Sequence, residues 1–460
     1  MAVGLAGRRR LVRPAHPRPR DILTGLVVVW LSLIALGTVV YLATGALDSV
    51  LDAVVESTAG FTTTALTSID PGGLSVPVQL WRAATQWIGG YVGLLALVVA
   101  FPQALQASSL AGDPDLLESH GGAGAPRGRT LGLLLGSTVQ SRRRIGGLYL
   151  GVTAALAVAY AATGLGAVDA AVHAMTTAST GGMSSHAGSF GDLGGGPRVV
   201  ATAGMIVAGA SIFAWWWIVQ GRWRAVLRSS GVRLYLATLA VSTAWLVVTV
   251  DGLSVGDALF TVAAATSTTG YAVVDWAHWP GGPSMLLLLL VAAGSMVGSV
   301  GGGLRLLRTR MFVASTLRDL RRQLAPRSVV VVRVDGRAVD EGALERISGY
   351  QVAHVGLVAV SALLFALIGA DVVEACWEGV SAVSTFGPAV GDIGSTGSLA
   401  TTGRAEELVA AFMAFAGRLS VVPVLLAGLG LVELRRRVRH RLARRRARVV
   451  ESDDTGTPAV

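Results

Sequence analysis

Four short stretches of the chain share a pattern of hydroxyl side chains and small residues. They are Thr62-Thr63-Thr64-Ala65, Ser179-Thr180-Gly181-Gly182, Ser267-Thr268-Thr269-Gly270 and Ser384-Thr385-Phe386-Gly387. A dehydrated monovalent cation inside a membrane needs replacement oxygens, and backbone carbonyls with occasional hydroxyls supply them densely. Glycine helps because it allows the backbone dihedrals that turn successive carbonyls toward one axis. Four such loops predict a ring that binds a cation.

Carboxylates recur in register with these loops, which indicates an internal repeat. If the last residue of each stretch is position zero, Asp52, Asp169, Asp257 and Glu374 all stand 13 residues earlier (65 − 52, 182 − 169, 270 − 257, 387 − 374). Each would begin a short pore helix, where a carboxylate meets the positive end of the helix dipole and the negative end faces the ion. Another three, Asp70, Asp275 and Asp392, follow position zero by 5 residues (70 − 65, 275 − 270, 392 − 387) and would make the outer mouth acidic.

The composition is that of an integral membrane protein. Of the 460 residues, 52% are hydrophobic and 14% charged, and the mean hydropathy is +0.60. Such a chain is too apolar for an ordinary water-soluble protein. Eight apolar runs are each about long enough to cross a bilayer: 22–44, 85–101, 147–163, 199–219, 233–250, 284–300, 351–369 and 408–432.

The placement of arginine predicts the orientation in the membrane. All 38 basic residues are arginine, and 34 lie before the first apolar run, after the last, or in three connections near 103–145, 221–233 and 305–346. The segments that carry the four loops, at about 45–80, 165–197, 252–283 and 370–403, contain none. By the positive-inside rule, both termini face the cytoplasm and the four loops lie on the outer side.

These patterns predict an all-α membrane protein built from four repeats of span, re-entrant pore helix with filter loop, and span. Eight transmembrane helices would then surround one central pore. The stretch of about 12 residues before each loop is too short to cross the membrane and long enough for a half-helix that dips in and returns. The expected units are an N-terminus at 1–20, repeats at 21–102, 145–220, 232–311 and 348–434, cytoplasmic loops at 103–144, 221–231 and 312–347, and a basic tail at 435–460.

With these motifs, the chain resembles the Trk, Ktr and HKT superfamily of potassium transporters from about residue 20 to 434. The stretch from Leu80-Trp81-Arg82 to Thr85-Gln86-Trp87-Ile88-Gly89-Gly90 is similar to the one that follows the first filter loop in that superfamily. The resemblance implies a multi-pass plasma-membrane protein that transports the potassium ion. It implies filter residues at Thr63, Thr64, Ala65, Thr180, Gly181, Gly182, Thr268, Thr269, Gly270, Thr385, Phe386 and Gly387.

Two features below the filter would form a gate. The run Gly298-Ser299-Val300-Gly301-Gly302-Gly303 would weaken a helix interior, and in the superfamily a flexible loop interrupts the helix here. A helix-packing face of small residues is the alternative, but this run is consecutive and not spaced at four. Arg418 lies inside the last apolar run, where a lone charge usually faces a water-filled interior. The resemblance gives Arg418 the role of an electrostatic barrier in the pore.

Ala65 stands where the superfamily usually has glycine. A methyl group hinders a positive φ, so one wall of the ring would hold its carbonyls differently. This favours an alternative, a sodium-permeable or poorly selective monovalent cation transporter of the same fold. A more distant alternative is a secondary transporter of an organic solute, which predicts broken helices in two halves and gives few reasons for four matching loops. A membrane sensor or scaffold is the third.

The cytoplasmic segments suggest partners. Residues 329–334 and 337–339, with a turn at Asp335-Gly336, predict a β-hairpin between the third and fourth repeats. The resemblance implies a homodimer and a separate cytosolic nucleotide-binding ring of the TrkA/KtrA type, since this chain has no phosphate-binding glycine motif of its own. The basic tail would touch membrane lipid, and nucleic acid is not an expected partner. The chain has one cysteine, Cys376, and no motif that indicates an enzyme or a bound catalytic cofactor.

Overall fold

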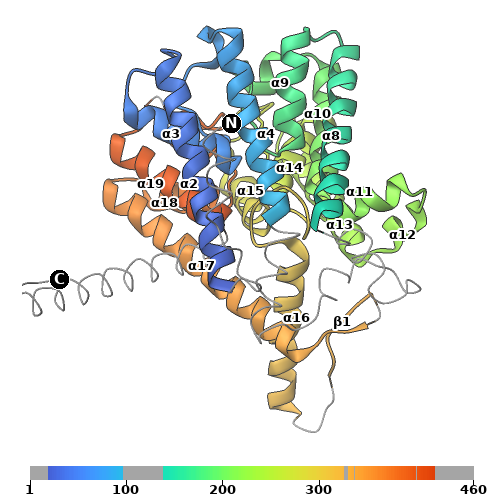
Figure 1. Cartoon of the computed structure of the whole chain (residues 1–460). Coiled ribbons are helices and arrows are strands. Elements are labelled where there is room, and N and C mark those ends of the chain that lie inside the picture. The colour runs from blue at the N-terminus through green and yellow to red at the C-terminus, as the bar shows by residue number, and fades with distance from the viewer. Residues whose placement is uncertain (1–18, 97–137, 326–329, 336, 400, 420–460) are drawn as a thin grey trace, which may run out of the picture.

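The computed structural model describes residues 19–96, 138–325, 330–335, 337–399 and 401–419, and these are predominantly helical (Figure 1). The predicted N-terminus at 1–20, the loop at 103–144 and the tail at 435–460 lie wholly or largely outside them.

Four long helices are α2 (Pro19–Ala43), α8 (Thr138–Ala162), α13 (Ser230–Thr249) and α17 (Glu341–Ile368). Each is followed by a short helix: α3 (Val50–Thr62), α9 (Ala167–Ala178), α14 (Val255–Ser267) and α18 (Val372–Val383). A second helix comes after each loop: α4 (Val76–Leu95), α10 (Gly195–Gly209), α15 (Gly281–Ala293) and α19 (Arg404–Arg418).

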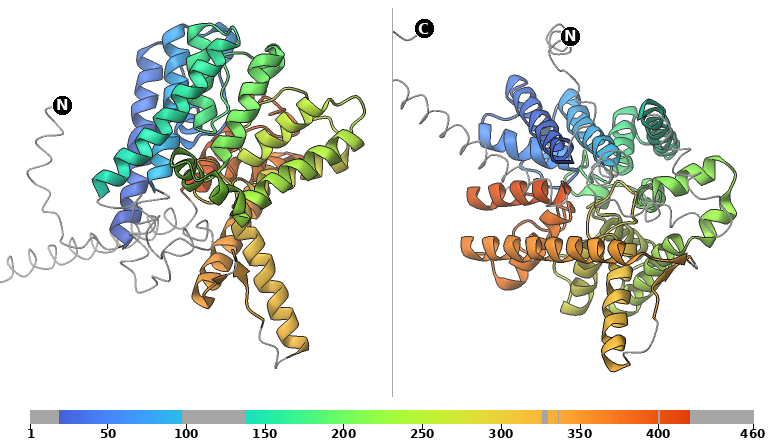
Figure 2. Two further views of the ribbon diagram at one scale, coloured as in Figure 1. Left: turned by 90° about the vertical axis from the view of Figure 1, so that its right-hand side faces the viewer. Right: turned by 60° about the horizontal axis from the view of Figure 1, so that its bottom comes forward.

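The packing of these helices closes on itself. Each short helix packs against the long helix before it in the chain, in the pairs α2–α3, α8–α9, α13–α14 and α17–α18. Each second helix packs against the next short helix, in the pairs α4–α9, α10–α14 and α15–α18, and α19 returns to α3. In the right-hand view of Figure 2 the colours accordingly run around the molecule until the red helix α19 lies beside the blue helices.

The short helices begin and end in the same way. The carboxylates Asp52, Asp169, Asp257 and Glu374 are each the third residue of their helix. Ser49 and Ser254 cap α3 and α14 by accepting a hydrogen bond from the backbone N–H of that third residue. Asp371 and Glu374 form a reciprocal capping box at the start of α18. A short side chain that accepts backbone N–H groups therefore sets where three of the four helices start.

Within the described part of the chain, only the first helix of each group has the length and apolarity of a simple membrane span. Among the described residues these spans are Ile22–Ala43, Arg142–Ala162, Ser230–Thr249 and Glu341–Ile368, and most of their surface is not buried within the chain. The second helices differ because they line the interior. Helix α4 carries the buried polar residues Arg82, Thr85 and Gln86, and residues 420–432 of the last predicted run lie outside the described part.

Two of the predicted apolar runs are not single helices: a break in the first was not predicted, and the predicted break after the second begins earlier than expected. The run 199–219 bends by 105° between α10 and α11 (Ile212–Val219), where Ser211 caps α11 and the Ile212 N–H donates to the Gly298 carbonyl. The run 284–300 ends at Ala293, and the chain is non-helical until α16 (Leu306–Leu324) begins. Hydropathy does not reveal such breaks, because the residues on both sides of them are apolar.

The segments predicted to be cytoplasmic contain more helix than the sequence suggested. The predicted loop 221–231 holds α12 (Trp223–Arg228), and most of the predicted loop 312–347 is taken up by α16 and α17. Between these two helices, β1 (Arg333–Val334) pairs antiparallel with β2 (Arg337–Ala338), so the hairpin is present but its strands are shorter than predicted. Figure 1 shows α16 and the hairpin projecting below the bundle.

Candidate cation-binding site

The four loops leave their helices through the same backbone conformation. Thr63, Thr180, Thr268 and Thr385 all take the left-handed region, with φ between 51° and 56°. This conformation is uncommon for a β-branched residue, and its recurrence at one register position indicates that the surrounding structure imposes it. At position zero, Gly182, Gly270 and Gly387 have φ of 77°, 86° and 104°. Ala65 is not among the described residues with positive φ, so the first loop differs from the other three.

The position-zero residues meet around the Ala65 side chain. The Ala65 N–H donates to the Phe386 carbonyl of the fourth loop at 3.2 Å. A Cβ built on Gly182 would lie 2.8 Å from the Ala65 Cβ, and one built on Gly270 would lie 2.6 Å from it. A Cβ on Gly387 would meet the Ala65 backbone. Residues from four distant parts of the chain therefore converge on one point, and the methyl group of Ala65 occupies it.

Gln86 links the first and second loops. Its Nε2 donates to the Gly181 carbonyl at 2.7 Å and to the Thr64 carbonyl at 3.3 Å, and its Oε1 accepts from the Met183 N–H at 3.2 Å. The side chain is fully buried. The sequence pattern placed Gln86 near the first loop but gave it no role. The sequence feature that could have identified Gln86 is a polar amide within an apolar run, close to Gly89 and Gly90.

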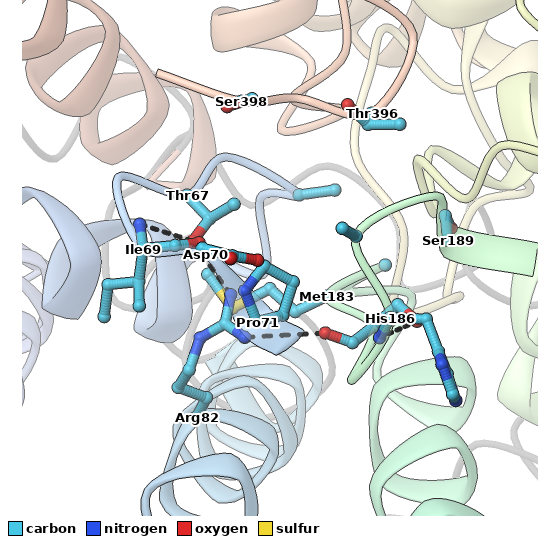
Figure 3. A pocket seen from close by; sticks show the side chains of 14 residues that line it. Thr67, Ile69, Asp70, Pro71, Arg82, Met183, His186, Ser189, Thr396 and Ser398 are labelled. Carbon is cyan, nitrogen blue, oxygen red and sulfur yellow. Dashed lines mark hydrogen bonds between the residues drawn. The ribbon is translucent and has the colours of Figure 1, made fainter. Parts of the chain in front are cut away.

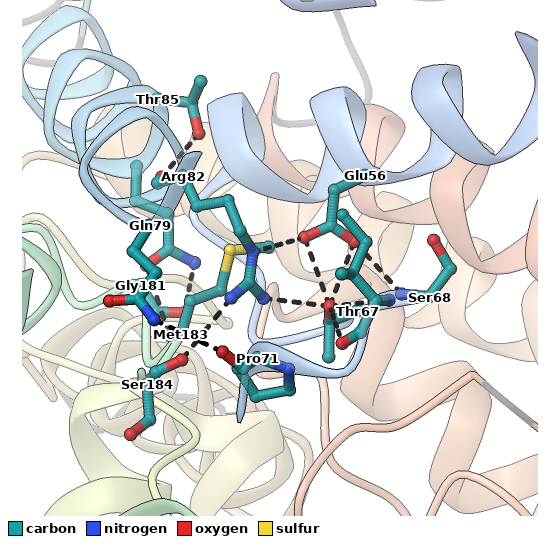
Figure 4. A network of polar contacts seen from close by, with 12 residues as sticks. Glu56, Thr67, Ser68, Pro71, Gln79, Arg82, Thr85, Gly181, Met183 and Ser184 are labelled. Atoms are coloured by element: carbon teal, nitrogen blue, oxygen red, sulfur yellow. Dashed lines mark hydrogen bonds and ion pairs between the residues drawn. The ribbon is translucent and has the colours of Figure 1, made fainter. Parts of the chain in front are cut away.

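A buried ion pair between α3 and α4 supports the first loop (Figure 4). Arg82 Nε lies 2.8 Å from Glu56 Oε1, and the two side chains are 3% and 0% exposed. Arg82 Nη2 also donates to Thr67 Oγ1 at 2.9 Å, and Glu56 accepts from the Ser68 N–H at 3.0 Å. A buried charge pair with its remaining hydrogen bonds satisfied fixes the geometry of the groups around it. The sequence reading did not single out Glu56.

A cavity of about 290 Å³ lies above the loops, on the side where the segments after position zero run (Figure 3). Its lining includes Ala65, Gly182, Asp70, Arg82 and His186. Ala65 and Gly182 are both part of its lining, so the cavity reaches the point where the four loops meet.

Asp275 and Asp392, two of the carboxylates predicted at the outer mouth, are held by the loops after position zero. Burial by itself would raise the pKa of Asp275, but hydrogen bonds from His278 and Ser395 outweigh it and hold this pKa below its ordinary value. The Ser395 Oγ lies 2.9 Å from Asp275 Oδ1. The Asp392 N–H donates to Glu374 at 2.9 Å, which joins the loop to the start of α18.

The carboxylates at the starts of the short helices have two kinds of partner. Asp169 and Glu374 accept from Ser185 Oγ and the Asp392 N–H, in the segments after position zero. Asp257 lies 3.6 Å from Arg198 of α10, and Asp52 pairs with Arg404 of α19. In both cases the arginine comes from the second helix of the preceding group. Asp257 and Asp52 therefore join neighbouring groups, and the loops contact the ends of the helix dipoles.

The glycine-rich segment lies directly beneath the third and fourth loops. The Gly302 N–H donates to Thr268 Oγ1 at 2.7 Å. A Cβ on Gly301 would overlap the Ser267 carbonyl, and one on Gly302 would overlap the Ser384 carbonyl. Glycine is required here because the backbones approach too closely for any side chain. Of the predicted gate residues, Gly298, Ser299, Gly301, Gly302 and Gly303 all belong to this non-helical segment between α15 and α16.

Two arginines hold this segment. Arg305 Nη1 donates to Ser295 Oγ and Ser299 Oγ, both at 2.9 Å, and so ties the segment to itself. Arg418 Nη1 donates to the Val300 carbonyl at 2.8 Å, and Arg418 Nη2 reaches the Gly89 carbonyl of α4 at 3.4 Å. Arg418 therefore bridges α19, the glycine-rich segment and α4 at one level below the loops. The sequence reading did not single out Arg305.

The helix pattern, the apolar spans and the converging carbonyl loops define the class of polytopic helical membrane proteins. Comparison with known proteins agrees, since the family model of TrkH, described as cation transport protein, matches residues 10–433. The chain belongs to the TrkH family of cation transport proteins. This confirms the resemblance found in the sequence.

Relatives and a solved structure support this assignment. The chain is 28% identical to "Trk system potassium uptake protein TrkH" of Halomonas elongata over 396 residues, which are 82% of this chain and 78% of that protein. It is 26% identical to the protein of the same name from Escherichia coli K12, over 80% of this chain and 76% of that protein. The crystal structure of the potassium transporter TrkH from Vibrio parahaemolyticus superposes with a TM-score of 0.76 at 22% identity, covering 91% of this chain and 85% of that one. That structure shares the fold.

Proposed function

We propose that the protein carries potassium across the plasma membrane through a filter formed by its four loops. The observation that carries the proposal is the convergence of four Thr-containing loops, from four successive helix groups, on the position of Ala65. Their backbone carbonyls and hydroxyls are the ligands that replace the hydration shell of a monovalent cation. Names of relatives such as "Trk system potassium uptake protein" agree with this choice of ion.

In this proposal the four groups are repeats that surround one pore with eight membrane-spanning helices. The cyclic packing of second helices on the next short helices supports it. The loops and the cavity above them face outward, and both termini face the cytoplasm, because arginine is concentrated in the opposite connections. The membrane potential then drives cations inward, at about 2.3 kcal/mol per charge for each 100 mV.

The glycine-rich segment 294–305 and Arg418 form the gate in this proposal. The segment contacts the third and fourth loops from below, and its strained, glycine-dependent backbone is suited to a second arrangement. Arg418 places a positive charge at the same level, which opposes the passage of a cation. A shift of the segment would move Arg418 with it, since Arg418 bonds to Val300.

The cytoplasmic hairpin offers a route by which a regulator acts on the gate. Val297 of the glycine-rich segment belongs to the same apolar cluster as Val332 and Val334 of the hairpin region, together with Leu307, Met311, Leu344 and Ile347. We infer that a cytosolic nucleotide-binding ring, supplied by a separate subunit, docks on this side of a homodimer. A displacement of the hairpin would reach Val297 through side chains in direct contact.

A sodium-permeable or poorly selective transporter is the second candidate, and Ala65 favours it. The methyl group lies among Gly182, Gly270 and Gly387, and the first loop has no positive φ at this position. One quarter of the ring therefore presents a methyl group where the other three present only backbone. A filter whose four quarters differ has a smaller difference in affinity between the smaller sodium ion and the larger potassium ion.

The function is tested by rubidium uptake into cells that lack their own potassium uptake systems. Expression of this chain, with and without a candidate cytosolic ring subunit, is expected to produce saturable uptake that potassium inhibits. Competition by sodium separates the two candidates. At a concentration comparable to that of potassium, sodium should inhibit rubidium uptake only by the less selective transporter. Absence of uptake in the presence of the ring, with the protein detected in the membrane, would refute a cation pathway.

A further inference from the structure

The four short helices carry a buried polar residue at one shared register position, and the fourth copy is exceptional. The position lies 9 residues before position zero (65 − 56, 182 − 173, 270 − 261, 387 − 378) and holds Glu56, His173, Thr261 and Glu378. Glu56 bonds to Arg82, His173 to Ser184, and Thr261 to the Asp257 carbonyl. Among the described residues, neither carboxylate oxygen of Glu378 has a hydrogen-bond donor, although this residue is only 1% exposed.

The fourth repeat lacks the side-chain donors that serve Glu56 in the first. Corresponding positions differ by 322 (387 − 65), so Thr67 corresponds to Ala389 and Arg82 to Arg404. Alanine has no hydroxyl to donate. Arg404 is exposed and bonds to Asp52 and Glu407 instead of Glu378. An ionised carboxylate buried without a donor or a cation costs several kcal/mol.

The groups around Glu378 add to this cost. Its carboxyl lies next to that of Glu406, at the start of α19, whose Oε1 is likewise buried without a hydrogen-bond partner among the described residues. Glu374 and Asp392 are the other charged groups that act on Glu378 most. All of these are acidic. The remaining helices that pack on α18 present uncharged groups: α17 meets Gly379 with Ala362, and Ser284 of α15 bonds to Trp377.

We propose that Glu378 and Glu406 form a proton-binding site in which the two carboxyl groups share one proton. Two neighbouring carboxylates, one of them fully buried, cannot both be ionised without a large cost in free energy, and a shared proton supplies the missing donor. A proton fits better than a metal ion, because the described residues contain no cluster of three acidic, histidine or cysteine side chains suited to a metal. Glu406 is only half-buried and connects Glu378 with the outer surface, so the proton exchanges with the external medium.

The site lies on the helix that carries the fourth loop, so its charge acts on the filter; this step rests on the proposed function. On the turn after Glu378, Ser381 Oγ accepts from the Gly387 N–H at 2.9 Å and positions that loop. Loss of the shared proton adds a negative charge behind the loop, which attracts a cation. External alkalinisation is therefore expected to lower the apparent KM for the transported cation.

The proton site is tested first without transport, by thermal unfolding of the purified protein in detergent from about pH 6 to about pH 9, where a buried carboxyl pair releases its proton. The folded state holds the proton more tightly than the unfolded state, so the melting temperature of the parent protein should fall as pH rises. Glu378→Gln should remove the part of this pH dependence that the carboxyl pair causes. Glu406→Gln removes the same pair from its more exposed side and serves if Glu378→Gln does not fold. Glu407→Gln, whose carboxylate pairs with Arg404, is the matched control and should retain the slope. Equal slopes in the parent protein and both pair variants would overturn the site.

The coupling is tested by rubidium uptake across the same external pH range. The apparent KM of the parent protein should fall with rising pH, while Glu378→Gln and Glu406→Gln should give a KM that does not change. Uptake with an identical pH profile in the parent protein and the variants would overturn the coupling while leaving the proposed function intact. Absence of uptake in every protein, with the unfolding slope still removed by the variants, would instead refute the proposed function and retain the proton site.

Discussion

At the scale of single residues, the site depends on a few side chains that fix backbone carbonyls in place. Gln86 joins two loops and Arg82 with Glu56 supports one of them, whereas Ala65 occupies the point where all four meet. Glycine and hydroxyl patterning predicted the loops from sequence alone, because those residue types are required by the local backbone. Gln86, Glu56 and Arg305 were not predicted as functional, because their roles arise from contacts with distant parts of the chain.

Ala65→Gly tests the unequal quarter of the proposed filter. Removing the methyl group allows a positive φ and gives the first loop the same freedom as the other three. We expect the ratio of potassium to sodium permeability to rise, measured from reversal potentials or competitive uptake. Ala187→Gly, in the lining of the outer cavity, is the control and should leave the ratio unchanged. An unchanged ratio in Ala65→Gly would show that Ala65 does not limit selectivity.

Gln86→Ala tests the link between the first two loops. It removes a buried amide and leaves the Met183 N–H and the Gly181 carbonyl without their partner, at about 1–3 kcal/mol for each buried group left unpaired. We expect a lower melting temperature and a loss of ion discrimination. Gln79→Ala, on the same helix but bonded to the Pro71 and Leu74 carbonyls outside the loops, should retain discrimination. Equal discrimination in both variants would contradict the role of Gln86.

At the scale of elements, the difference between first and second helices explains which predictions held. The four first helices are exposed and uniformly apolar, so hydropathy finds them. The second helices line the site and carry polar residues, bends or a glycine-rich break. The break between Ala293 and Leu306 was expected to begin only at Gly298, and the bend near Ser211 was not expected at all. The Ile212 to Gly298 hydrogen bond shows that these two irregular segments stabilise each other.

Val334→Ser tests the contact between the hairpin and the glycine-rich segment. Val334 is buried in the cluster that includes Val297, and its burial contributes about 1.5–3 kcal/mol. We expect rubidium uptake in this variant to lose most of its response to the cytosolic ring subunit. Val331→Ser, at an exposed position nearby, is the control and should respond like the parent protein. A full response in Val334→Ser would place the regulatory contact elsewhere.

At the scale of the whole molecule, four helix groups close into a ring because each second helix packs on the next short helix. The seam between the last and first groups is held by Arg404 with Asp52, and by the backbone pairing of Thr67 with Gly397 and Leu399. The sequence predicted four groups from the register of loops and carboxylates. It did not predict which groups are neighbours, since the ring order depends on the tertiary packing.

Cysteine labelling tests the orientation of the ring in the membrane. In a Cys376→Ser background, Asp251→Cys lies in the exposed turn after α13, and Leu324→Cys lies at the end of α16, where Leu324 is 88% exposed. A membrane-impermeant maleimide applied to intact cells should label Asp251→Cys at once. Leu324→Cys should react only after the membrane is permeabilised. The opposite pattern would place the loops on the cytoplasmic side.

The most direct test of the four-loop pathway is cation flux into liposomes that contain the purified protein, compared with Gly182→Ala. A Cβ at residue 182 would overlap the Thr269 carbonyl of the neighbouring loop, and its φ of 77° is strained for alanine. Gly349→Ala, where a Cβ meets open space on α17, is the matched control. We expect potassium-dependent flux in the parent protein and in Gly349→Ala, and its loss in Gly182→Ala with the fold retained. Equal flux in all three proteins would show that cations do not pass where the four loops meet.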